Sequence, residues 1–252
     1  MASPMRLSTG MSTALIIINA EVNEHGAIVT TSPATKKMVA ALKQTINTCL
    51  GEPVEVKVVA AALLSADSDN SSRSPELALA NSDAHTIYCP LTIQLPSTFD
   101  FPARLVFQAC KDVESRRRWV HRQLQYQIGL NKAWLGDLWL PIVLTAKGPL
   151  YGEVIGEGAV PNSYEQPIDL ADDLRQSLYH LAYELLQSIS ALPAVYLMQF
   201  TVKDRAIVFD RLWPFPAAPA IASLTAQYPD LFTCHWHCLT QQPILDLTVH
   251  KR

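Results

Sequence analysis

Residues 168–220 constrain the fold of this chain most, because they read as one continuous unit of an amphipathic helix and two apolar strands. Asp169 is placed to cap the start of the helix, and Asp172 and Asp173 fall in its first turn, where the helix dipole favours negative charge. Apolar residues recur at the spacing of one helix face, at Leu174, Leu178, Leu181, Leu185 and Ile189. We therefore predict a helix with one buried face.

Two strands are expected after this helix. Residues 195–202 are apolar on both faces, as in a buried strand, and residues 206–212 return as a second strand after a polar turn at 203–205. The second strand should end at the run Trp213, Pro214, Phe215 and Pro216, because proline lacks the N–H group that a sheet needs. The segment thus predicts a helix, a hairpin and a proline-rich exit.

This order of helix, strand, turn, strand and proline resembles the C-terminal end of ATP-grasp ligases. The resemblance covers about the last third of the chain and reaches back to a strand at 141–145. It implies three positions whose side chains, in that family, hold the magnesium ions that bridge the ATP phosphates, and here these positions read Gln199, Asp210 and Leu212. Magnesium takes oxygen ligands, commonly carboxylates, and leucine offers none. Nothing in the chain matches the family's paired phosphate-binding lysines or its glycine-rich nucleotide loop, so the resemblance implies the fold with degenerate metal-ligand positions.

Residues 1–110 read as a βαβ-like N-terminal part. An apolar strand at 14–19 and a strand-like run at 54–64 flank a helix at 34–50, and this order indicates a parallel sheet. The polar stretch at 65–75 is expected to be a surface loop or a linker.

Further strands are expected at 86–95 and 104–109, followed by a long helix over 112–130. We therefore predict an α/β fold. Its βαβ-like part spans 1–110, its ATP-grasp-like part of helix plus antiparallel strands spans 111–252, and the two form one compact unit.

Composition and charge narrow the classes of function. With 49% hydrophobic and 17% charged residues among 252, the chain can fill a core. A net charge of −3 creates no field that would draw the molecule to nucleic acid or to an anionic membrane. The apolar runs fall well short of the roughly 20 residues that cross a bilayer, and the first residues lack the apolar region of a signal peptide. We therefore expect a cytoplasmic protein without a membrane or nucleic-acid partner, whose five cysteines are free thiols.

The densest basic cluster lies in the predicted helix at 112–130 and contains Arg116, Arg117, Arg118, His121 and Arg122. Arginine recognises phosphate and carboxylate groups through two parallel hydrogen bonds. The cluster is interpreted either as a solvated face or as a surface for an acidic protein partner, to which Arg116, Arg118 and Arg122 would contribute. Nucleic acid is the least favoured partner because the chain is acidic overall.

A glycine-rich stretch at 144–158 carries Lys147, Glu153 and Glu157. Its glycine spacing matches neither a dinucleotide fingerprint nor a phosphate loop, so a hairpin is the simpler interpretation. Lys147 could still contact a phosphate, and Glu153 or Glu157 could join Asp210 around a bound nucleotide. The candidate cofactor-binding residues are Asp210, Glu153 and Lys147, although no cofactor is expected.

The pentapeptide Cys234-His235-Trp236-His237-Cys238 contains the usual ligands of zinc. On a strand, the expected conformation here, its cysteines and histidines point to opposite faces, so at most two of them could reach one metal. A half-buried terminal strand without metal is the favoured interpretation.

Trp213 and Phe215 are expected to form a contact surface or to line a cleft, with burial in a core as the competing account. Combined with the degenerate metal positions, this favours a non-catalytic binding, assembly or regulatory protein with a protein partner. The first alternative is an ATP-dependent carboxylate–amine ligase, and the second is a metal-binding protein that uses the Cys/His pentapeptide.

Overall fold

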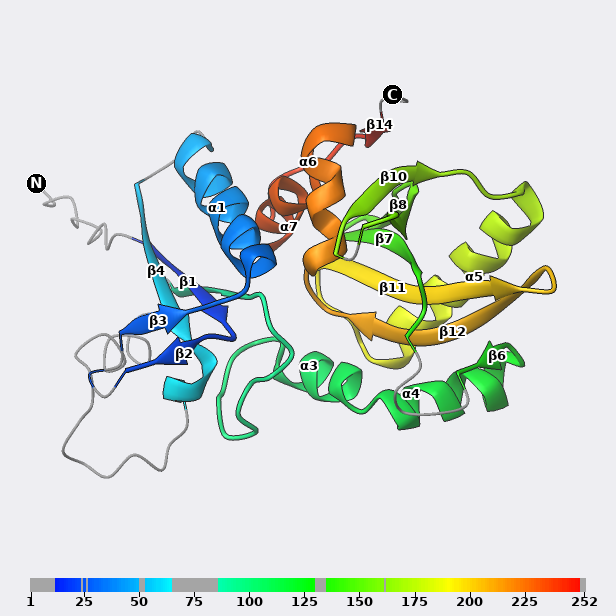
Figure 1. Cartoon of the computed structure of the whole chain (residues 1–252), viewed down its shortest axis with the longest axis horizontal. Helices are drawn as coiled ribbons and strands as arrows, with labels where there is room; N and C mark the ends of the chain where they lie inside the picture. The colour runs from blue at the N-terminus through cyan, green and yellow to red at the C-terminus, as the bar shows by residue number, and fades with distance from the viewer. Residues whose placement is uncertain are drawn as a thin grey trace, which may run out of the picture.

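A computed structural model of the chain describes residues 12–23, 25, 27–49, 53–64, 86–129, 135–160 and 162–249. The predicted polar loop at 65–75 lies outside the described residues. Figure 1 shows a small parallel sheet at one end of the molecule and a larger sheet at the other, with the helices α6 (Ser223–Ala226) and α7 (Leu231–Leu239) between them. No helix among the described residues is both long and apolar enough to cross a membrane.

The N-terminal sheet confirms the predicted βαβ order. Strand β1 (Ser12–Ile18) lies between β4 (Val54–Ala60) and β5 (Thr86–Pro90), and both neighbours run parallel to it. Helix α1 (Pro33–Thr48) makes the crossover, and it begins where the Ser32 side chain accepts a hydrogen bond from the Thr35 N–H. Its buried face carries Met38, Leu42 and Ile46 as the spacing predicts.

Short elements complete this part of the chain. After β1, the strands β2 (Glu21–Val22) and β3 (Ile28–Thr30) form a small antiparallel pair. After β4, the 3-10 helix η1 (Ala61–Leu64) adds one helical turn.

The segment that leads to the second sheet differs from the sequence prediction. Residues 104–109 form helix α3 (Arg104–Lys111), not a strand, because Val106, Phe107 and Cys110 lie at helical spacing and are buried together. The predicted long helix at 112–130 is shorter and comprises α4 (Val113–Trp119) with the π-helical turn η2 (Val120–Leu124). It ends where Gln125 adopts a left-handed backbone conformation with φ of 61°, and the chain then enters a short strand, β6 (Gln127–Ile128).

The second sheet contains seven strands and holds the predicted hairpin in its middle. Helix α5 (Asp172–Ser188) precedes the strands β11 (Ala194–Lys203) and β12 (Ala206–Trp213). Asp204 and Arg205 form the tight turn between these two strands, with φ of 51° and 60°. The start of α5 departs from the prediction, since its N-cap residue is Ala171, and Asp169 instead pairs with Arg175. The order of strands is β10 (Tyr164–Ile168), β9 (Val154–Glu157), β7 (Leu138–Thr145), β11 (Ala194–Lys203), β12 (Ala206–Trp213) and β6, with β8 (Gly148–Tyr151) also paired to β7.

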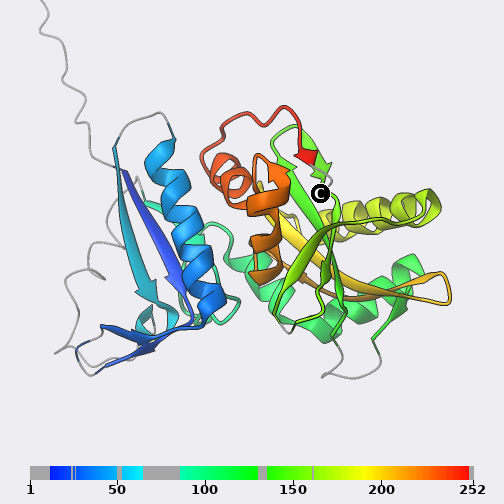
Figure 2. The same cartoon turned by 45° about the horizontal axis from the view of Figure 1, so that its top comes forward.

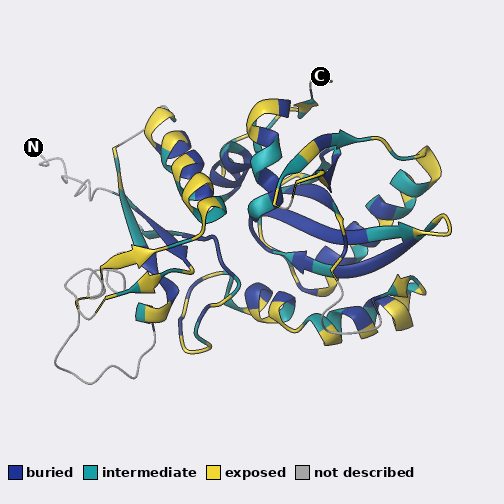
Figure 3. Cartoon of the chain, viewed as in Figure 1, coloured by how far each residue is buried: buried dark blue, intermediate teal, exposed yellow. Residues whose placement is uncertain are grey.

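The two faces of this sheet contribute to two hydrophobic clusters, following the alternation of side chains along a strand. On β11, Tyr196, Met198 and Phe200 belong to the cluster that contains the buried face of α5, whereas Val195 and Leu197 belong to the cluster that contains α7, α1 and the small sheet. The latter cluster joins residues from both sheets, and Figures 2 and 3 show α7 beside α1, with most of α7 buried. The chain after β12 forms η3 (Ala218–Ala222), α6 (Ser223–Ala226), β13 (Gln227–Tyr228), α7 (Leu231–Leu239) and β14 (Thr248–Val249).

Candidate functional site

Asp210 is the extra residue of a β-bulge in the central hairpin. The pairing of β11 with β12 passes from Phe200 opposite Phe209 directly to Gln199 opposite Arg211, which leaves Asp210 without a cross-strand partner. Its side chain is fully buried. A buried carboxylate must be paired or hydrogen-bonded to stay charged, so its neighbours decide what it can do.

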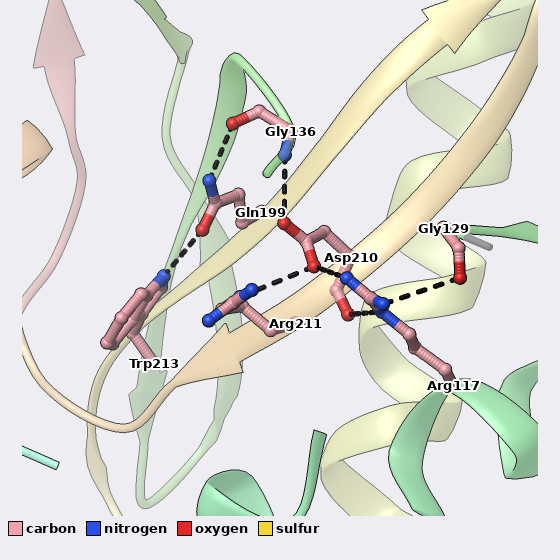
Figure 4. A network of polar contacts seen from close by, with 7 residues as sticks. All are labelled: Arg117, Gly129, Gly136, Gln199, Asp210, Arg211 and Trp213. Atoms are coloured by element: carbon pink, nitrogen blue, oxygen red, sulfur yellow. Dashed lines mark hydrogen bonds and ion pairs between the residues drawn. The ribbon is translucent and has the colours of Figure 1, made fainter. Parts of the chain in front are cut away.

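Arg117 of α4 satisfies both the bulge and its carboxylate. The Arg117 Nε–H donates to the main-chain oxygen of Asp210 at 3.0 Å, and its Nη2 forms a short ion pair with Asp210 Oδ1. Arg117 is only 4% exposed, and its Nη1 also donates to the Gly129 carbonyl at 3.4 Å (Figure 4). The guanidinium therefore joins α4 to the middle of the sheet.

Gly136, just before β7, is held from both sides by the hairpin. Its N–H donates to Asp210 Oδ2 at 2.8 Å, and its carbonyl accepts from Gln199 Nε2 at 2.5 Å. A Cβ atom at this position would lie 2.4 Å from the main-chain oxygen of Phe200, so only glycine allows this approach. Two of the three positions that the ATP-grasp resemblance implies, Gln199 and Asp210, thus hold a backbone segment in place.

Gln199 also joins the network to the aromatic run after β12. Its Oε1 accepts from the Trp213 indole N–H at 3.0 Å, so both ends of its amide are engaged. Arg211 lies between Asp210 and Trp213. Its Nε–H donates to Asp210 Oδ1 at 3.3 Å, and its guanidinium carbon lies 5.7 Å from the centre of the Trp213 ring.

A cavity of about 470 Å³ opens beside this network, between the start of α1 and the large sheet. We call it the Arg211 cavity, because Arg211 is the one charged residue among the described residues that line it. Its aromatic wall contains Trp139, Trp213 and Phe215, and Tyr164 stands edge-on to Trp139 with ring centres 5.5 Å apart. The opposite wall comes from the start of α1 and from the segment after β5, with Ser32, Ala34, Thr35, Leu91, Thr92, Ile93 and Gln94.

Trp213 and Phe215 therefore line a cavity, and Phe215 is also a core residue. Phe215 is only 3% exposed and stacks on Phe107 of α3 with ring centres 6.0 Å apart. Trp213 is half-buried and meets Phe215 edge-on. The two aromatic residues face the interior, and their expected role as a contact surface for a protein stays a prediction.

The structure does not gather the other candidate cofactor-binding residues around Asp210. Lys147 is exposed in the turn between β7 and β8, which is the hairpin that the glycine pattern predicts. Glu153 is paired with Arg175 of α5 at 2.8 Å, and Glu157 is exposed. Among the described residues, no three Asp, Glu, His or Cys side chains are grouped closely enough to hold a metal ion.

The basic cluster on α4 and η2 points in several directions. Arg117 is the buried partner of Asp210, and Arg116 donates to Ser188 of α5 at 3.3 Å. Arg118 and Arg122 are exposed, and Arg118 has a neighbour of opposite charge in Glu114 at 3.9 Å. The sequence pattern groups the arginines of α4 and η2 and does not predict that Arg117 and Arg211 contact Asp210.

The Cys/His pentapeptide lies on a helix rather than on the predicted strand. Residues 234–238 belong to α7, because Asp230 accepts hydrogen bonds from the Phe232 and Thr233 N–H groups and so caps a helix start. Burial lowers the pKa of His235 to about 3 and raises the pKa of the Cys238 thiol to about 12. His235 accepts the Val195 N–H at its Nδ1 atom, 3.2 Å away, so it anchors α7 to the start of β11.

The sequence matches no protein-family profile and no curated protein, but its fold is similar to that of solved ATP-grasp enzymes. Glycinamide-RNase-transformylase T from Mycobacterium tuberculosis is 13% identical, with a TM-score of 0.63 over 92% of this chain and 80% of that one. N5-carboxyaminoimidazole ribonucleotide synthetase from Thermotoga maritima is 10% identical, with a TM-score of 0.63 over 95% and 78%. N5-carboxyaminoimidazole synthetase from Staphylococcus aureus is 10% identical, with a TM-score of 0.64 over 94% and 80%. The predicted ATP-grasp-like α/β fold is confirmed, and at these identities the similarity extends to the fold alone.

Proposed function

We propose that this chain is a non-catalytic binding protein on an ATP-grasp-like scaffold. One observation carries the proposal: the Asp210 carboxylate has two guanidinium groups and a backbone N–H as its neighbours, from Arg117, Arg211 and Gly136. In this arrangement, protein cations and an N–H donor surround the carboxylate that a metal ion would need.

The three positions do not fit a magnesium site. Magnesium demands near-octahedral oxygen coordination and commonly uses one or two carboxylates. Both oxygens of Asp210 accept hydrogen bonds from the protein, and Gln199 is engaged at both ends of its amide. Leu212 is aliphatic and 2% exposed. Releasing Asp210 to a metal would take its carboxylate away from the buried Arg117 guanidinium, which is costly.

The binding role is supported by the Arg211 cavity, which is large enough for a small ligand and combines aromatic walls with one cation. A protein partner is the second part of the proposal. Arg118 and Arg122 are exposed on neighbouring turns of α4 and η2 and offer hydrogen-bond donors to an acidic surface.

Two alternatives make different demands on the same residues. A carboxylate–amine ligase, the activity class of ATP-grasp relatives, needs carboxylates that are available to a metal–nucleotide complex, and its products would appear only with ATP. A metal-binding protein built on α7 needs Cys234, Cys238 or the histidines to ligate together, and zinc analysis of the purified protein distinguishes it.

Calorimetric titration with Mg-ATP tests the proposal, and we expect no saturable binding below millimolar concentration. The physical reason is that Asp210, Gln199 and Leu212 offer no open set of oxygen ligands to the metal that accompanies the phosphates. The Staphylococcus aureus enzyme of similar fold, which is described as complexed with ADP, serves as the positive control. Micromolar affinity of this chain for Mg-ATP that is lost in EDTA would contradict the proposal and favour the ligase.

A further inference from the structure

We propose that the Arg211 cavity binds a small organic anion without a metal ion, with the carboxylate or phosphate group on Arg211 and a planar or apolar body against the tryptophans. This inference rests on the proposed binding function and names the ligand class for the same site.

The two arginines beside Asp210 hold its carboxylate unequally. The carboxylate faces two guanidinium groups, those of Arg117 and Arg211. Arg117 takes the carboxylate from the buried side, through its ion pair and the main-chain contact. Among the described residues, Arg211 contacts the carboxylate through Nε at 3.3 Å. Arg211 therefore brings a positive charge to the cavity, and no other charged side chain lines the cavity among the described residues.

Arg211 carries the hydrogen-bond donors that an anion requires. A guanidinium carries five N–H donors in a planar fork. The Arg211 side chain is 17% exposed, and among the described residues its hydrogen bonding is limited to Nε–H donating to Asp210. The Arg211 side chain forms part of the cavity wall. Figure 4 shows its guanidinium group between Asp210 and the Trp213 ring. Two parallel N–H groups match the oxygens of a carboxylate or a phosphate.

The remaining walls of the Arg211 cavity suit a flat or apolar body. Trp213 lies beside the guanidinium and is fixed by its hydrogen bond to Gln199, so its ring keeps one orientation. Trp139 is buried on the neighbouring part of the sheet and is fixed edge-on by Tyr164. Rigid aromatic walls with a single charged group favour a ligand that has a flat or apolar body and one anionic end. The volume of about 470 Å³ falls within the range of small-molecule sites.

Three probes of similar size test the proposal in the presence of EDTA: phenyl phosphate, benzoate and benzamide. Binding is followed by calorimetry and by quenching of tryptophan fluorescence, since Trp139 and Trp213 lie in the wall. We expect saturable binding of phenyl phosphate, benzoate or both at millimolar concentration or below, and about tenfold weaker binding of benzamide, which keeps the shape of benzoate and lacks its charge. The phosphate and carboxylate probes show which of the two groups the site prefers.

The variant Arg211→Gln should weaken anion binding about tenfold or more. Asp210 keeps its contacts with Arg117 and Gly136 in this variant, so the fold is expected to persist. Arg118→Gln, which removes an exposed arginine outside the cavity, is the matched control and should bind like the unmodified protein. The comparison of benzoate with benzamide on the unmodified protein decides the case even if Arg211→Gln unfolds.

The inference is overturned if neither anion binds, if benzamide binds as tightly as benzoate, or if folded Arg211→Gln binds the anions unchanged. These outcomes are distinct from failure of the proposed function, which a micromolar Mg-ATP affinity that is lost in EDTA would reveal. Metal-free anion binding together with weak Mg-ATP binding supports both.

Discussion

Replacing Asp210 with alanine is expected to lower the free energy of unfolding by about 3–5 kcal/mol, because the buried Arg117 guanidinium would lose the carboxylate that faces it. Asp210 is fully buried and Arg117 is 4% exposed, so water cannot replace the lost carboxylate without rearrangement. The Gly136 N–H would lose its acceptor as well. Urea unfolding followed by circular dichroism measures the loss.

The control for this prediction is Asp173→Ala. Asp173 pairs with Arg205 at 3.3 Å on the surface, where both side chains are largely exposed, and its removal should cost less than about 1 kcal/mol. The double variant Arg117→Met with Asp210→Leu should recover much of the stability, since apolar replacement of a buried pair is often neutral. Equal losses for Asp210→Ala and Asp173→Ala would show that the buried pair does not hold the sheet to α4.

Phe215→Ala is expected to destabilise the protein by about 3–5 kcal/mol, as truncation of a buried aromatic residue typically does. Phe215 is 3% exposed and contacts Phe107 and Trp213, so its removal leaves a hole between α3 and the large sheet. Differential scanning calorimetry and urea titration measure the effect.

Leu105→Ala on α3 provides the comparison, because Leu105 is 70% exposed and its truncation should change stability by about 0.5 kcal/mol or less. If Phe215→Ala folds as stably as the unmodified protein and loses a bound protein partner instead, the residue belongs to an interface and its assignment to the core is wrong.

The strongest sequence predictions were those that rest on local periodicity. The leucine spacing of α5, the two apolar runs of β11 and β12 and the polar turn between them are short-range patterns, and the structure reproduces them. The order of β1, α1 and β4 followed for the same reason. Residues 104–109 were misread because a short apolar run fits a strand or a helix equally well, and burial of one face of α3 decides for the helix.

The candidate site was harder to predict because its main features are long-range. Arg117 and Asp210 are 93 residues apart, and no local pattern pairs them. The bulge at Asp210 is equally hidden, since a regular hairpin would place Asp210, not Arg211, opposite Gln199. That shift of one residue brings Arg211 beside Gln199 and Trp213 at the cavity. The prediction of a strand for residues 234–238 was wrong, because the residue that caps the helix, Asp230, lies outside the Cys/His pentapeptide.

The claim that the Asp210 carboxylate is unavailable to a metal ion is tested by measuring whether a divalent metal ion binds with nucleotide at the hairpin. Mn²⁺ replaces Mg²⁺ in oxygen-ligand sites, and electron paramagnetic resonance distinguishes protein-bound Mn²⁺ from Mn²⁺ held by ADP in solution. With Asp210 occupied by Arg117, Arg211 and Gly136, the spectrum of Mn²⁺ and ADP should be unchanged by a stoichiometric amount of this protein. A protein-bound Mn²⁺ signal of about one ion per chain that is lost in a folded Asp210→Asn variant would contradict the account.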